Sequence, residues 1–172
     1  MADSGTAMGS DFLKVITQEL QKLKTQGDKA IAQLSDDRKV HVRLDEESNS
    51  IDIIVRHLVG NMLSRWTDFL TTDGEKPTRK RDAEFEPAPS LTRAELTAMW
   101  EKGWACLFGT LESLTAANLQ QTVRIAGKEM SAMDAILRQS SHYAAHVGQI
   151  VFLAKHLEWQ RWQPLSVPRK KP

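Results

Sequence analysis

The chain has 172 residues, 41% of them hydrophobic and 26% charged, a composition typical of one globular domain with a buried core. Its formal net charge of +1 provides no general attraction to nucleic acid or to an anionic membrane, so neither is expected as a partner. The single cysteine excludes an intrachain disulfide, and no apolar run approaches the roughly 20 residues that cross a bilayer. These features predict a cytoplasmic protein.

A first helix is predicted after a short polar lead. Residues 1–10 are small and polar, and we expect them to be disordered. From Asp11, a suitable N-cap residue, apolar side chains recur at helical spacing as far as Leu34, which indicates an amphipathic helix. The polar segment 35–50 follows, and its composition predicts that His41 is exposed to solvent.

A second helix is predicted from about Ser50 to Leu70. Its buried side is marked by Ile51, Ile54, Leu58, Met62, Trp66 and Phe69. His57 lies beside this apolar stripe. An imidazole in that position must be hydrogen-bonded, exposed or bound to a ligand, because an unpaired buried polar group is costly.

A long polar connection, residues 71–89, separates the second helix from the third. Its basic residues are Lys76, Arg79, Lys80 and Arg81. Acidic residues flank them, so a solvated loop is the simplest interpretation. At up to ~3.3 Å per residue, the connection can return along a helix of ~30 Å. The helices on either side of it could therefore lie parallel, which a tight turn would forbid.

Local capping and turn signals define the second half of the chain. Thr92 and Glu95 have the spacing of a capping box and open the third helix. Residues 122–130, with Gly127 at the turn, predict a short β-hairpin. Ser131 then provides the N-cap of a fourth helix.

The fourth helix carries a histidine pair beside its apolar stripe. The stripe consists of Ile136, Tyr143, Val147, Ile150, Ala154 and Leu157. His142 and His146 are four residues apart, so both imidazoles lie on one face, one turn apart. Two imidazoles in this arrangement can bind one metal ion. His156 lies about 80° farther around the helix and is poorly placed as a further ligand.

Together these elements predict an all-α four-helix bundle over residues 11–163, with a short β-hairpin before the last helix and a basic tail at 164–172. Metal sites in bundles form from inward side chains of facing helices, here His57 with His142 and His146. A ferritin-like di-iron site would need a glutamate three residues before the ligand histidines, and none is present. Separately satisfied structural histidines are the alternative.

Two segments resemble proteins of a known superfamily. Residues 56–74, RHLVGNMLSRWTDFLTTDG, and 141–150, SHYAAHVGQI, are similar to an uncharacterised bacterial branch of the DinB/YfiT-like metalloenzymes. The resemblance extends over nearly the whole chain. It implies an up-down-down-up bundle, often a homodimer, with a divalent metal on three histidines, which correspond to His57, His142 and His146.

The resemblance also implies a class of chemistry, since some relatives use this site for thiol-dependent transfer or isomerisation with a low-molecular-weight thiol. Three neutral imidazoles leave a coordination position open, as in catalytic zinc sites, and all-nitrogen ligation suits zinc or nickel. Asn61 and Gln149, each about one turn from a histidine, could line the pocket or orient the imidazoles. Tyr143 should point about 100° away from His142.

We therefore expect a metal-dependent transferase or hydrolase that acts on a small-molecule substrate. Two alternatives remain open. The chain could be a metal-binding bundle without catalysis, or a purely structural dimeric bundle whose histidines bind no metal.

Overall fold

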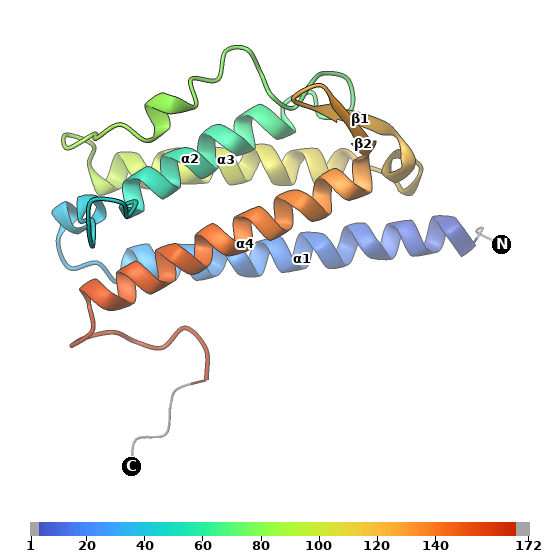
Figure 1. Cartoon of the computed structure of the whole chain (residues 1–172). Coiled ribbons are helices and arrows are strands. Elements are labelled where there is room, and N and C mark those ends of the chain that lie inside the picture. Colours follow the sequence, from blue (N-terminus) through green and yellow to red (C-terminus); the bar gives the residue numbers. More distant parts are fainter. Residues whose placement is uncertain (1–3, 168–172) are drawn as a thin grey trace.

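The chain folds into a bundle of long α-helices with a small hairpin at one end, as the computed structural model in Figure 1 shows. The structure describes residues 4–167. Its helices are α1 (Ser4–Ala32), α2 (Ile51–Trp66), α3 (Arg93–Ser113) and α4 (Ala132–Leu157), and its strands are β1 (Thr122–Ile125) and β2 (Lys128–Ser131). The short 3-10 helices η1 (Asp37–His41), η2 (Asp82–Glu84) and η3 (Ala116–Gln120) lie in the connections. The predicted four-helix bundle with a hairpin before its last helix is confirmed.

The helix directions follow from the long connection between α2 and α3. Helices α1 and α4 run one way along the bundle, and α2 and α3 run the other way (Figure 1). The connection, drawn in green, returns along the outside of α2 to the end where α2 began. Within the described residues, no helix is long and apolar enough to span a membrane.

Helix α1 begins at Ser4, seven residues before the predicted N-cap at Asp11. The expectation of a disordered lead is therefore wrong for residues 4–10, and residues 1–3 lie outside the described part. Gly9 is buried where α1 crosses η3, and a Cβ on it would lie 2.7 Å from the Cβ of Ala116. Contact with η3 stabilises the helical turns formed by residues 4–10. Tertiary packing can stabilise a helical segment whose composition alone would not make it helical.

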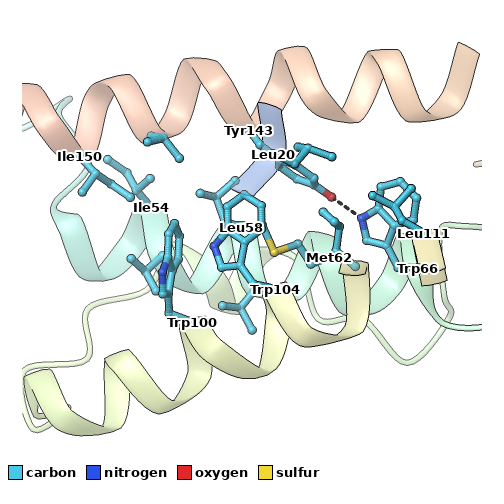
Figure 2. Close-up of a cluster of buried hydrophobic side chains, with 14 of the residues drawn as sticks. Leu20, Ile54, Leu58, Met62, Trp66, Trp100, Trp104, Leu111, Tyr143 and Ile150 are labelled. Atoms are coloured by element: carbon cyan, nitrogen blue, oxygen red, sulfur yellow. Dashed lines mark hydrogen bonds between the residues drawn. The ribbon is translucent and has the colours of Figure 1, made fainter. Parts of the chain in front are cut away.

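The core lies between the four helices and is rich in tryptophan, with Trp66, Trp100 and Trp104 at most 1% exposed (Figure 2). Trp66 Nε1 donates a hydrogen bond of 2.8 Å to the hydroxyl of Tyr143, which donates one of 3.0 Å to Asn61 Oδ1. Buried Trp and Tyr polar groups need such partners. Tyr143 thus joins α4 to α2 inside the core through its hydroxyl, while its ring centroid lies 5.8 Å from that of His142.

The hairpin connects the end of the bundle to the start of the long connection. Its strands are antiparallel, and Ala126 and Gly127 at the turn have φ angles of 52° and 73°. Asp73 accepts hydrogen bonds of 2.8 and 2.7 Å from the backbone N–H groups of these two residues. Ser131 ends the hairpin and caps α4, as predicted, by accepting a hydrogen bond from the N–H of Asp134.

Candidate metal centre

Three histidines from two facing helices meet beside the core. His57 comes from α2, and His142 and His146 come from α4. One ring nitrogen of each lies within 4.8 Å of the others. The ring centroids of His57 are 5.3 Å from His142 and 5.1 Å from His146, and the two α4 rings are 4.6 Å apart. The group could therefore hold one metal ion.

The group is more deeply buried on the α2 side than on the α4 side. His57 is 7% exposed, on a helix that is covered by its neighbours along most of its length. His142 and His146 are only half-buried. The α4 side of the group is therefore the more exposed of the two.

A buried glutamate from the long connection holds the ring of His57. Glu84, in η2, places its Oε2 atom 3.0 Å from His57 Nδ1. A carboxylate only accepts hydrogen bonds, so the imidazole proton belongs on Nδ1 and the lone pair on Nε2 is free to bind a metal. Carboxylate–histidine pairs of this kind orient the imidazole ligands of metal sites.

Arg79 holds the glutamate in turn, which corrects the prediction of a solvated basic loop. Its Nε and Nη2 atoms donate hydrogen bonds of 2.7 and 2.8 Å to the two oxygens of Glu84, and its side chain is 5% exposed. Burial alone would raise the pKa of Glu84, but the hydrogen bonds from Arg79 and His57 outweigh burial and lower it. The carboxylate beside His57 is therefore ionised at neutral pH.

Gly60 makes room for this carboxylate on the surface of α2. A Cβ at Gly60 would overlap Glu84 Oε1 and lie 2.8 Å from its Cδ. Because Gly60 is one turn beyond His57, the missing side chain lets the glutamate approach the ring. Sequence reasoning missed Glu84, although a glycine inside a buried helix is a signal of close approach.

The polar residues predicted near the histidines have different positions. Gln149 places Oε1 2.7 Å from His146 Nδ1, so it holds the second imidazole with Nε2 free, as expected for a residue that orients a ligand. Asn61 accepts its hydrogen bond from Tyr143 and so links the two helices. Asn61 is thus bonded to a core residue and not to a histidine.

His142 provides the test of whether the group fits a metal. Its Nε2 atom is buried and has no hydrogen-bond partner within residues 4–167. Burial, followed by the nearby His146 and His57, lowers the pKa of His142 to about 4, and burial also lowers the pKa of His146. Both rings are therefore neutral near pH 7, the form that binds metals. A divalent ion would satisfy the unpaired nitrogen.

Comparison with protein families identifies the group to which the chain belongs. A family model described as "Protein of unknown function (DUF1572)" matches residues 7–171. The chain is a member of the DUF1572 family. The match includes both helices that carry the three histidines. Comparisons with curated proteins and with solved structures gave no match.

The other two histidines of this DUF1572 chain lie outside the group. The prediction that His41 is exposed to solvent was wrong, because its Nε2 donates a 2.9 Å hydrogen bond to the carbonyl of Leu91 and its Nδ1 lies 3.4 Å from Asp52. His41 thus links η1 to the start of α2 through Asp52 and to the segment before α3 through Leu91. His156 is exposed on α4 and takes no part in the group, as predicted.

A small pocket lies near the histidine group, although no histidine lines it. It has a volume of about 260 Å³ and is lined partly by Ile54, Gln149, Phe152 and Leu153. Ile54 is one turn before His57, and Gln149 holds His146 through its side chain. The pocket is therefore within one helical turn of two of the candidate ligands.

Proposed function

We propose that this DUF1572 chain is a divalent-metal-dependent enzyme whose His57, His142 and His146 hold one zinc or nickel ion. The observation that carries the proposal is the Nε2 of His142, which is buried beside two other imidazoles and has no hydrogen-bond partner among residues 4–167. Those two rings have their Nδ1 atoms engaged by Glu84 and Gln149, which frees their Nε2 atoms in the same way.

The donor set selects the kind of metal. Imidazole nitrogens suit zinc, nickel, copper and iron, whereas magnesium and calcium prefer oxygen ligands. His57, His142 and His146 would hold a divalent ion through three neutral imidazoles, and such an ion would supply acidity to a bound water or thiol. The charged pair of Glu84 and Arg79 keeps His57 in its metal-binding tautomer and orientation.

The class of reaction is transfer of a group to or from a low-molecular-weight thiol, or hydrolysis of a small molecule. The half-buried α4 side of the group and the 260 Å³ pocket that Gln149 also lines support a small substrate. The resemblance to DinB/YfiT-like metalloenzymes supports the thiol, a homodimer and a bacterial cytoplasmic setting. Light scattering on the purified chain tests the dimer.

Metal content tests the centre directly. Untagged protein should contain about one zinc or nickel ion per chain by elemental analysis, and His57→Ala, His142→Ala and His146→Ala should each lose it. His156→Ala is the matched control, because His156 is exposed on the same helix outside the group, and it should keep the metal. Wild-type protein that contains no metal and takes up none on titration would refute the proposal.

Thiol chemistry is tested with the cobalt-substituted protein. Cysteine or another small thiol that enters the open position should produce a sulfur-to-cobalt charge-transfer band in the near ultraviolet. Conjugation of that thiol to monochlorobimane should then depend on the metal and disappear in His142→Ala. Ester hydrolysis is measured on the same protein. If the protein binds cobalt but shows no charge-transfer band, no thiol conjugation and no ester hydrolysis, it is a metal-binding bundle without enzymatic activity.

A further inference from the structure

A second cavity adjoins the Arg79–Glu84 pair that holds His57, and Gly60 is also part of its wall. It has a volume of about 600 Å³, is open to solvent, and is lined by α2, by Met99 of α3 and by the connection from Lys76 to Glu84. Its apolar walls include Val59, Leu63 and Met99. A cavity of this size and character is suited to a small organic ligand.

The charged residues around this cavity are mostly cationic. They are Arg56, Lys76, Arg79, Lys80 and Glu84. Both arginines have carboxylate partners, whereas neither lysine forms an ion pair within residues 4–167. The Nε of Arg56 is buried and unpaired in the same part of the chain. Lys76 Nζ donates hydrogen bonds of 2.6 and 2.7 Å to Thr72 Oγ1 and to the carbonyl of Asp73, so its charge is solvated by the protein but, in the described part of the chain, not paired with a carboxylate at ion-pair distance. The cavity therefore combines an apolar interior with a cationic rim at the two lysines.

We propose that this cavity binds a small organic anion with an apolar body, of the chemical class of a medium-chain carboxylate. The carboxylate lies at the cationic rim formed by Lys76 and Lys80, where it accepts hydrogen bonds from their ammonium groups. The hydrocarbon chain lies against Val59, Leu63 and Met99, where it loses contact with water. Burial lowers the pKa of Lys76, and a bound anion would offset that effect.

Octanoate is a suitable probe, measured by calorimetry on the full chain in a metal chelator so that the result does not depend on metal binding. It should bind with one site per chain and about 16-fold more tightly than hexanoate, because each methylene buried is equivalent to about a fourfold gain in affinity. Octanol, which has the same chain without the charge, should bind more weakly. Failure of the metal proposal would leave this result unaffected.

Substitutions locate the anion and the chain. Lys76→Gln and Lys80→Gln should each weaken octanoate binding about two- to fivefold and leave octanol binding unchanged. Lys155→Gln, on the exposed surface of α4, is the matched control and should change neither. Leu63→Glu should abolish octanoate binding, because it puts a carboxylate on the half-buried wall of the cavity, with circular dichroism confirming the fold.

Three results would overturn the proposal. The first is no octanoate binding at millimolar concentration. The second is equal affinity for octanoate and octanol with no effect of either lysine substitution, which would mean that the charge is not recognised. The third is octanoate binding that survives Leu63→Glu, which would place the ligand elsewhere.

Discussion

Replacing Gly60 with alanine should weaken metal binding without unfolding the bundle. The new Cβ would overlap Glu84 Oε1 and lie 2.8 Å from its Cδ, so the flexible carboxylate must move away from His57. Loss of such an acceptor behind a ligand histidine costs about 10–100-fold in metal affinity, or about 1.4–2.7 kcal/mol. Inside a helix, alanine is more stable than glycine by roughly 0.5–1 kcal/mol. In the metal-free protein, this gain in folding free energy offsets part of the free energy lost by displacing Glu84.

The measurement is a zinc competition titration against a chromophoric chelator, beside thermal unfolding of the metal-free protein. Glu84→Gln should show a comparable loss of affinity, because it removes the charge that orients the ring. Gly109→Ala is the matched control, since Gly109 is an exposed helical glycine whose Cβ would meet nothing within 4 Å. If Gly60→Ala binds zinc within twofold of the wild type, Glu84 does not orient His57 and the reasoning fails.

Three further predictions concern stability. Zinc at 100 times its dissociation constant should stabilise the wild type by about 2.7 kcal/mol in thermal unfolding but leave His142→Ala unchanged. Tyr143→Phe should lower the unfolding free energy by about 1–3 kcal/mol in urea titrations, because Trp66 Nε1 loses its buried acceptor. Burial alone would raise the pKa of Glu158, but a backbone N–H and Lys39 hold it at about 2, below its ordinary 4.5. That contribution, about 1–3 kcal/mol, is present above pH 4.5 and is lost as the pH falls towards 2; acid unfolding of Glu158→Gln should lack this loss.

Features determined by neighbours in the sequence were predictable. Thr92 and Glu95 form the capping box that their spacing indicated, and the hairpin turns at Gly127. The His142–His146 pair lies on one face of α4 because the helical repeat requires it. In each case, the structure depends on residues within about one turn of each other.

Features determined by distant contacts were not predictable from local patterns. Charge alternation in the long connection indicated a solvated loop, yet Arg79 and Glu84 are buried against α2. His41 lies in a polar segment, and its partners are Asp52 and a carbonyl 50 residues away. Burying these polar groups costs little free energy only when each has a hydrogen-bond partner. Here the partners come from elements that are distant in the sequence, so no local pattern links them.

The topology of the bundle explains why the candidate metal centre contains a buried carboxylate. Because α2 and α3 run in the same direction, the chain between them must return along the bundle, and it does so over α2 (Figure 1). That return places Glu84 above Gly60 and within hydrogen-bond distance of His57. A tight turn between α2 and α3 would make them antiparallel and would leave Nδ1 of His57 without this acceptor. The connection that the parallel helices require is thus also the element that orients the first ligand.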